Sequence, residues 1–207
     1  MLNSNLVIIS GKVDVVKSKK EQTDKGLTTV SRFRLTHTDY TGRQHRFIIE
    51  CRGRTADKVS NYQKGTNVIV KAGRIMMDKF TDGNSTQTLV LVYAIAIAEI
   101  PAGTDLCFNT VVFSGRLTRE PVLQTVKTSK GDKKVLNITL CYNDLNGVPH
   151  FVAVDVWNKL AESSNSAKKG SMIEVRGSLI YKEWGNNKSQ TLINANELDF
   201  VSAPINA

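Results

Sequence analysis

The sequence predicts an all-β protein built from two similar barrels in tandem. Three observations carry this prediction: the chain repeats itself once, each repeat consists of strand-like segments, and turn-forming residues separate those segments. The repeat has a period of about 105 residues, which is too long for a solenoid and suits a duplicated domain.

Matched positions along the whole chain support the repeat. Residues 5–12, NLVIISGK, match residues 109–116, NTVVFSGR. Later matches keep their order and spacing: Gly42 with Gly147, His45 with His150, Lys64 with Lys169, Gly65 with Gly170 and, after a one-residue shift, Gly73 with Gly177 and Phe80 with Trp184. Between the repeats, the PAGT stretch at 101–104 has turn chemistry. We therefore expect a first domain at 1–101, a linker at 102–107 and a second domain at 108–207.

The second repeat shows the order of elements most clearly. Its strand-like segments are rich in β-branched and aromatic residues and lie at 110–117, 135–142, 151–157, 171–184 and 190–200. A polar segment at 159–167 can form one short helix between the third and fourth strands, and 55–62 is its counterpart in the first repeat. Five strands with one helix in that place is the order of the OB-fold, a Greek-key barrel that commonly holds oligonucleotides on one face. We therefore expect two tandem OB-folds.

Composition narrows the class of protein. The net charge of +9 indicates a polyanionic partner, and it is concentrated in residues 1–104, which carry +7 of it. The three cysteines (Cys51, Cys107 and Cys141) have neither a disulfide framework nor a zinc-site spacing, so we expect no metal and no cofactor. No apolar run reaches about 18 residues, and the start of the chain lacks the features of a signal peptide. We expect a cytoplasmic, nucleoid-associated protein with no membrane partner.

Alternation along the third strand of the second repeat separates a core face from a solvent face. Val152, Val154 and Val156 share one face, which is uniformly apolar and predicts the core. The opposite face carries Phe151, Ala153, Asp155 and Trp157. Two large aromatic side chains outside the core are suited to stacking on bases, and each stacked base contributes about 1–3 kcal/mol whatever its identity.

The fourth strand of the second repeat shows the same division. Ile173, Val175, Leu179 and Tyr181 share the core parity, whereas Arg176, Ile180, Lys182 and Trp184 share the other. A guanidinium, an ammonium and an indole on one surface suit a phosphate backbone and its bases together. We add Arg116 and Lys159 to the expected DNA-binding set of this repeat.

The first repeat keeps the pattern but changes the chemistry. Phe47, Ile49 and Cys51 take the core parity, and Arg46, Ile48, Glu50 and Arg52 take the other. Arg46 and Arg52 thus stand where the second repeat has Phe151 and Trp157, and arginine can both contact phosphate and stack on a base. The remaining DNA-binding candidates here are Arg43, Arg54, Lys71, Arg74 and Phe80, the last at the position of Trp184. Glu50 and Asp155 are expected to position neighbouring arginines.

Each repeat also has a lysine-rich segment, at 17–25 and at 127–134. We expect each of these segments to be a loop that borders the binding groove.

The segment 151–184, FVAVDVWNKLAESSNSAKKGSMIEVRGSLIYKEW, resembles the bacterial single-stranded-DNA-binding protein family. In that family the third strand has an aromatic residue at each end and is followed by a small residue and the motif K-L-A-E. A K-G-S motif comes next, and then a strand that ends in a basic residue, any residue and a tryptophan. The resemblance covers nearly all of 109–202 and is weaker over 5–100, where it depends on the internal repeat. It implies base-stacking roles for Phe151, Trp157 and Trp184, and for Tyr142 as a further aromatic.

The resemblance also implies partners. Family members usually end in an acidic tip that recruits repair and replication enzymes, whereas this sequence ends in VSAPINA. We therefore expect either that recruitment uses another surface or that the protein has a narrower role than general protection of the genome. Members generally assemble four OB-folds, so the resemblance implies a homodimer of this two-domain chain.

The sequence contains no phosphate-binding GxxxxGK[ST] loop, no GxSxG elbow and no HExxH helix, so we do not expect an enzyme. Of the three histidines, His37, His45 and His150, the last two occupy equivalent positions of the repeat, which favours a structural or interface role over catalysis. The main hypothesis is sequence-tolerant binding of single-stranded DNA in replication, recombination or repair. Two alternatives stay open: an OB-fold interaction subunit of a larger nucleic-acid-processing complex, and a binder of single-stranded RNA.

Overall fold

The structure, a computed structural model, describes residues 4–24, 26–82, 85–104, 106–129, 131–144, 146–184 and 188–202, with backbone only at 79–82, 85–87, 184 and 188. The chain forms two compact units. One comprises residues 6–109 and 181–190, and the other comprises residues 1–5, 110–180 and 191–207. The boundaries expected at 101 and 108 stay a prediction.

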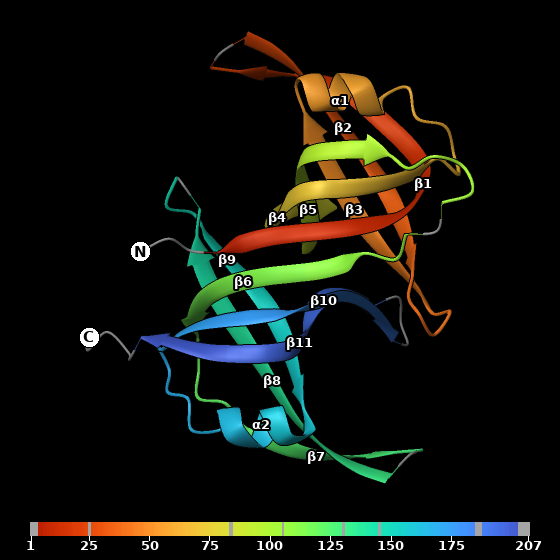
Figure 1. Cartoon of the computed structure of the whole chain (residues 1–207). Helices are drawn as coiled ribbons and strands as arrows, with labels where there is room; N and C mark the ends of the chain where they lie inside the picture. The colour runs from red at the N-terminus through yellow and green to blue at the C-terminus, as the bar shows by residue number, and fades with distance from the viewer. Residues whose placement is uncertain are drawn as a thin grey trace. The chain divides into compact units, whose positions relative to one another are not determined.

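The first unit contains a closed five-stranded barrel (Figure 1). Its strands are β1 (Asn5–Thr23), β2 (Gly26–Thr38), β3 (Gln44–Arg52), β4 (Asn67–Asp82) and β5 (Ser85–Glu99). They run in the spatial order β2-β3-β5-β4-β1, and pairing of β1 with β2 closes the barrel. β3 and β5 are parallel, and the other pairs are antiparallel. The short helix α1 (Arg54–Val59) lies between β3 and β4, as expected, and buries Ala56 and Val59.

The second barrel repeats this plan. Its elements are β6 (Asn109–Leu117), β7 (Leu123–Thr128), β8 (Gly131–Asn143), β9 (Pro149–Trp157), α2 (Asn158–Ser164), β10 (Met172–Trp184) and β11 (Lys188–Ser202). The spatial order is β6-β10-β11-β9-β8, with β6 pairing with β8 to close the barrel and β7 added beside β8. β9 and β11 are parallel, like β3 and β5. The expected OB-fold architecture is therefore confirmed, and β6 and β7 together correspond to the long strand β1 of the first barrel.

The division between core and solvent faces is confirmed in both barrels. Three side chains of β9 and three of β3 are at most 1% exposed: Val152, Val154, Val156, Phe47, Ile49 and Cys51. Ile173, Val175 and Leu179 of β10 are buried in the same way. Because successive side chains of a strand point to opposite faces, burial of these positions leaves their neighbours on the outer surface.

Most of each lysine-rich segment is strand, with residues 17–23 in β1, 127–128 in β7 and 131–134 in β8, so the expectation of loops is wrong. β1 continues to Thr23 and pairs residue by residue with β2, for example Lys20 with Thr29 and Thr23 with Gly26. β7 and β8 form the matching ribbon around 128–131. Polar residues are tolerated here because the ribbon extends beyond the core, and side-chain hydrogen bonds such as Lys20 Nζ to Thr29 Oγ1 (2.7 Å) and Lys134 Nζ to Thr125 Oγ1 (3.0 Å) stabilise it.

The turns β2–β3 and β8–β9 are built alike. In the first, Asp39 Oδ1 accepts hydrogen bonds from the backbone N–H groups of Thr41 (2.8 Å) and Arg43 (3.0 Å), and Asp39 Oδ2 lies 3.3 Å from His45 Nε2. In the second, Asp144 Oδ1 accepts from Asn146 and Val148, and Oδ2 lies 3.3 Å from His150 Nε2. His45 and His150 therefore have a structural role, consistent with their matched places in the repeat.

The Asp39 turn predicts that the stability of the fold decreases at low pH. Burial raises the pKa of Asp39, but the hydrogen bonds from Thr41 and Arg43 outweigh it and lower the pKa to about 2. Because the folded-state pKa lies below the unfolded value of about 3.9, the ionised carboxylate stabilises the fold above pH 4 and loses this effect as the pH falls towards 2.

We expect Asp39→Asn to lower the free energy of unfolding by about 1 kcal/mol at pH 7, and the difference from the unsubstituted protein to shrink towards zero near pH 2. Urea unfolding followed by circular dichroism at several pH values measures this difference. A difference that stays constant from pH 5 to pH 2 would contradict the assignment of the lowered pKa to Asp39.

Candidate nucleic-acid interface

Two aromatic side chains lie on the outer face of β9. Phe151 is the third residue of the strand and is 46% exposed, and Trp157 is its last residue and is partly exposed. Six residues of extended chain separate them by roughly 20 Å. The valines between them in sequence fill the barrel core, so neither ring belongs to that core.

The strand β9 ends at Trp157 because the backbone turns at the next residue. Asn158 adopts a left-handed φ of 56°, which turns the chain directly into α2. The matched residue of the first barrel is Gly53, with φ 57°. Asparagine and glycine are the residues that adopt this conformation at least cost. A residue with a positive φ therefore follows both Trp157 and its counterpart, Arg52.

Polar groups occupy the middle of this outer face. Asp155 is 4% exposed, and its Oδ1 accepts a hydrogen bond of 2.6 Å from Nδ2 of Asn137 on β8. Asn194 of β11 lies opposite Asp155 on its other side. The surface between the two aromatics thus offers amide groups that can bond to the edge of a base.

A cation stands across the barrel surface from Phe151. The register pairs Arg116 of β6 with Cys141 of β8, and Cys141 with Phe151 of β9. The three residues form one row on the outer face, which places Arg116 two strands, roughly 10 Å, from Phe151. Its Nη1 donates a hydrogen bond of 2.8 Å to the carbonyl of Gly170, which holds the guanidinium in place.

Two expected members of the site, Tyr142 and Arg176, contact other side chains of the second barrel. Tyr142 is buried, with its ring edge-on to Phe113 (centroids 5.3 Å apart) and stacked on His150 (5.0 Å), because it has the core parity of β8. Arg176 is exposed, but its guanidinium lies 3.4 Å from Glu174 and 3.8 Å from Glu197. Tyr142 therefore does not present a ring to a base. The DNA contact expected of Arg176 stays a prediction, because exposed ion pairs of this kind contribute only about 0–1 kcal/mol.

The structure describes some of the remaining DNA-binding candidates of the second repeat and not others. Lys159 is exposed at the start of α2, and Lys182 is partly exposed within the 181–190 segment. The side chain of Trp184, and that of its counterpart Phe80, lie outside the described part of the structure.

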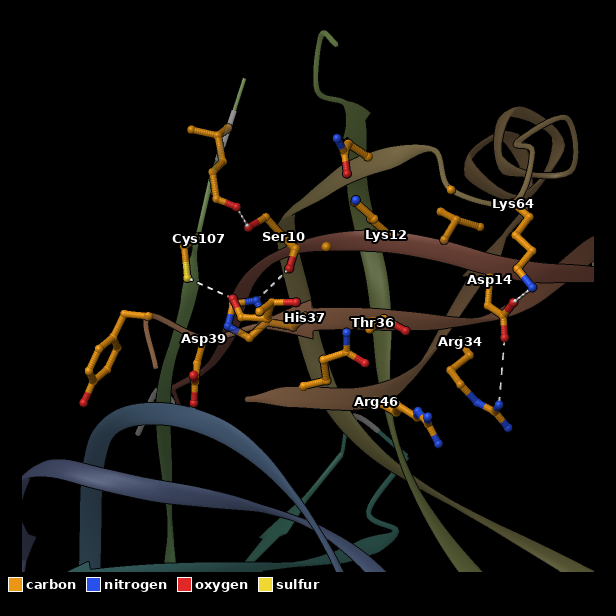
Figure 2. Close-up of a pocket in the computed structure, with 18 residues that line it drawn as sticks. Ser10, Lys12, Asp14, Arg34, Thr36, His37, Asp39, Arg46, Lys64 and Cys107 are labelled. Atoms are coloured by element: carbon orange, nitrogen blue, oxygen red, sulfur yellow. Dashed lines mark hydrogen bonds and ion pairs between the residues drawn. The ribbon is translucent and has the colours of Figure 1, made fainter. Parts of the chain in front are cut away.

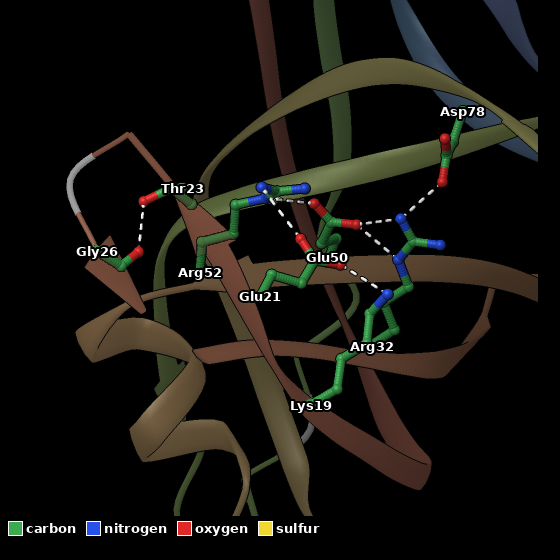
Figure 3. A network of polar contacts seen from close by, with 8 residues as sticks. All are labelled: Lys19, Glu21, Thr23, Gly26, Arg32, Glu50, Arg52 and Asp78. Atoms are coloured by element: carbon green, nitrogen blue, oxygen red, sulfur yellow. Dashed lines mark hydrogen bonds and ion pairs between the residues drawn. The ribbon is translucent and has the colours of Figure 1, made fainter. Parts of the chain in front are cut away.

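The matching face of the first barrel carries a network of charged side chains (Figure 3). Oε2 of Glu50, which is 4% exposed, accepts a hydrogen bond of 2.6 Å from Nε of Arg32, and its Oε1 accepts one of 2.8 Å from Nε of Arg52. Arg32 also donates to Asp78 (2.6 Å), and Arg52 lies 3.6 Å from Glu21. Lys19 pairs with Glu21 at 2.6 Å. The expectation that Glu50 positions arginines is confirmed.

This network changes the expected role of Arg52. Three cations (Lys19, Arg32 and Arg52) face three carboxylates (Glu21, Glu50 and Asp78), so this part of the surface is balanced in charge. The hydrogen bond with Glu50 raises the pKa of Arg52, which is the sign of a stabilised ion pair. Glu50 and Glu21 would repel a phosphate that approaches this guanidinium, and the phosphate contact expected of Arg52 stays a prediction.

The other expected cations of the first barrel are on the surface. The exposed side chains are those of Arg43, Arg46, Arg54, Lys71 and Arg74. Sequence reasoning missed Arg32, although its register opposite Glu50 follows from pairing the second and third strands. Within the described ranges, no helix is long and apolar enough to cross a membrane, and no group of three or more His, Cys, Asp or Glu side chains could hold a metal ion.

Comparisons with known proteins agree with this geometry. Residues 108–201 match the model of the single-strand binding protein family. Single-stranded DNA-binding protein 1 of Synechocystis sp. is 31% identical over 105 residues, which span 46% of this chain and 84% of that protein. Single-stranded DNA-binding protein 1 of Nostoc sp. is 28% identical over 106 residues, which span 47% of this chain and 87% of that protein.

Solved structures extend the likeness to both barrels. The crystal structure of wild-type single-stranded DNA binding protein from Thermus aquaticus has a TM-score of 0.75 and 25% identity, and the match covers 100% of this chain and 98% of that one. A deletion mutant of the Thermus protein has a TM-score of 0.76 at 24% identity. The strand order, the aromatic pair on β9 and these relatives agree, and the chain belongs to the single-strand binding protein family.

Proposed function

We propose that this protein binds single-stranded DNA with little sequence preference, chiefly on the outer face of the second barrel. The observation that carries this proposal is the pair Phe151 and Trp157, two accessible aromatics on a strand whose other face is sealed in the core. Every base has a π-face, so stacking on such rings tolerates any sequence. The relatives named above are single-stranded DNA-binding proteins, which supports the same function.

Cations around the aromatic pair would contact the phosphates. Arg116 lies in the row of Phe151, and Lys159 follows Trp157 at the start of α2. We include Lys182 and the aromatic Trp184 of β10 in the proposed site on the strength of their sequence positions. We further propose that the protein acts in DNA replication, recombination or repair, and that two chains associate to present four barrels.

A titration with dT oligomers, followed by tryptophan fluorescence, tests this function. The chain has two tryptophans, Trp157 and Trp184, both at proposed stacking positions, so binding should quench the emission. The logarithm of the binding constant should fall with the logarithm of salt concentration, with a slope of about −0.7 for each phosphate contacted. Absence of quenching by dT oligomers of any length at low salt would overturn the proposal. Competition with rU oligomers of equal length separates a DNA preference from an RNA preference.

One observation favours a second candidate function for the first barrel. Its charge-balanced network occupies the place that carries Trp157 in the second barrel, so that part of the surface is poorly suited to nucleic acid. An OB-fold interaction subunit of a larger complex would use such a surface for a protein partner. Native mass spectrometry distinguishes the two states: a homodimer supports the proposed assembly, whereas a stoichiometric second protein supports the interaction subunit.

A further inference from the structure

A backbone N–H group of β10 donates a hydrogen bond to a buried side chain of β3. The amide nitrogen of Tyr181 lies 3.1 Å from Nδ1 of His45, which is 2% exposed. Tyr181 begins the segment 181–190, which groups with the first barrel, whereas residues 110–180 group with the second. The hydrogen bond therefore lies at the residue where β10 leaves one compact unit and enters the other.

The same hydrogen bond lies where β10 continues past its neighbour in the sheet. The register of β10 with β6 would place Leu179 opposite Asn109, the first residue of β6. Tyr181 is two residues further along β10 and lies beyond the end of that strand. A backbone N–H group at such an edge needs an acceptor from elsewhere, because an unpaired donor away from water costs as much as a lost hydrogen bond. His45 supplies this acceptor.

The two hydrogen-bond partners of His45 determine its tautomer. A backbone N–H group can only donate, so Nδ1 accepts from Tyr181 and the proton of the neutral ring is on Nε2. Nε2 lies 3.3 Å from Oδ2 of Asp39 and donates to it. His45 thus uses one nitrogen for its own turn and the other for a backbone group 136 residues away in sequence.

The ring of His45 contacts two other rings of the first barrel. It stacks on Phe47, with 6.2 Å between the centroids, and on His37, with 6.5 Å. Phe47 belongs to the core, and Nδ1 of His37 donates to the carbonyl oxygen of Ser10 at 2.9 Å (Figure 2). These contacts fix the direction of the acceptor nitrogen of His45 before any ligand binds, which is the condition for a residue that positions another group.

His150 is the matched residue of the second barrel. It is 4% exposed, its Nε2 lies 3.3 Å from Oδ2 of Asp144, and its ring stacks on Tyr142. Both histidines therefore support a turn in the same way. The hydrogen bond from Tyr181 is a further contact that His45 makes, so His150 serves as a control for the turn contact.

We propose that His45 is a positioning residue for DNA binding: its Nδ1 holds the backbone of β10 at Tyr181 and so places the residues that follow for contact with the DNA strand. Lys182 and Trp184 lie one and three residues after Tyr181 on β10. This inference depends on the proposed function, which includes both residues in the binding site. It makes a buried side chain of the first barrel a determinant of binding by β10.

Two substitutions separate the two hydrogen bonds of His45. In His45→Asn, the side-chain oxygen is as many bonds from the backbone as Nδ1, so it can accept from Tyr181 but does not reach Asp39. In His45→Gln, the side-chain nitrogen is as many bonds from the backbone as Nε2, so it can donate to Asp39 but no longer offers an acceptor to Tyr181. A general loss of folding would affect both variants, so the difference between them reports the Tyr181 bond.

Amide hydrogen exchange, followed by NMR on the full chain, measures this bond directly. The amide of Tyr181 should exchange about tenfold faster in His45→Gln than in the unsubstituted protein, because its acceptor is lost. In His45→Asn its exchange should stay close to the original rate. His150→Gln disturbs the matched turn and should leave the exchange of Tyr181 unchanged.

Binding measurements show whether His45 acts through Trp184. By fluorescence anisotropy of a labelled dT oligomer, His45→Gln should raise the dissociation constant about fivefold or more, and His45→Asn should raise it much less. In a chain that also carries Trp184→Ala, adding His45→Gln should have little further effect, because the stacking side chain that it positions is absent.

The outcomes distinguish this inference from the proposed function. Equal exchange of Tyr181 in His45→Asn and His45→Gln would overturn the inference, as would a loss of binding by His45→Gln that is the same with and without Trp184. Quenching of the unsubstituted protein by dT oligomers would still support the proposed function in both cases. Absence of that quenching overturns the proposed function itself. Faster exchange confined to His45→Gln, together with non-additive losses of binding, supports the inference.

Discussion

Replacing both Phe151 and Trp157 with alanine should weaken the binding of dT oligomers by about 2–6 kcal/mol, because each stacked base contributes about 1–3 kcal/mol. This corresponds to a dissociation constant raised at least about thirtyfold. The fold should survive, since neither side chain belongs to the valine core of β9. Fluorescence anisotropy with a labelled oligomer measures the loss, because the double variant has lost one of its two tryptophans.

Phe200→Ala is the matched control. Phe200 lies on β11 and is 50% exposed, close to the 46% of Phe151, but it is not on the outer face of β9. It should leave the affinity unchanged. The aromatic exchange Phe151→Tyr, Trp157→Phe should retain most of the binding. The stacking mechanism would be refuted by a double alanine variant that binds as tightly as the Phe200→Ala protein.

The substitution Glu50→Ala should lower the free energy of unfolding of the first barrel by about 3 kcal/mol. Breaking a buried ion pair by removing one partner typically costs about 3–5 kcal/mol, and we take the low end because Arg32 and Arg52 are partly exposed. Without this carboxylate, two guanidinium groups stand close together with less compensation. Thermal or urea unfolding followed by circular dichroism should show one transition moving while that of the second barrel stays in place.

Graded variants identify the cause. Glu50→Gln keeps hydrogen-bonding atoms but loses the charge, so its effect should lie between those of the unsubstituted protein and Glu50→Ala. Asp78→Ala removes a more exposed partner of Arg32 and should cost less than about 1 kcal/mol. If Glu50→Ala proves no more destabilising than Asp78→Ala, the network does not stabilise the barrel as described.

Much of the site could be read from alternation along single strands. The valines of β9 and their counterparts in β3 identified the core face, and the structure buries all six expected side chains. The same pattern placed Phe151, Trp157 and Arg46 on the outside, where they are at least partly exposed. Such inferences succeed because the two-residue period of a strand is a property of its own backbone.

Inferences that depended on a second strand were less secure. Tyr142 was aligned with a family aromatic, but the parity of β8 turns it inward against Phe113 and His150. Arg176 stood on the outer face as expected, yet Glu174 and Glu197 lie beside it. The lysine-rich segments were expected as loops because their composition is polar, and only their pairing shows that they are strands.

The sequence by itself determined the tandem barrels, the two faces of each central strand and the aromatic pair of the second barrel. These follow from local periodicity and from an internal repeat, both of which are visible along one chain. Only the tertiary structure decided which charges are balanced. Arg32 contacts Glu50, which is 18 residues away in sequence, and Asp78, which is 46 residues away. Strand register and burial, and not composition, therefore decide that this part of the first barrel is balanced in charge.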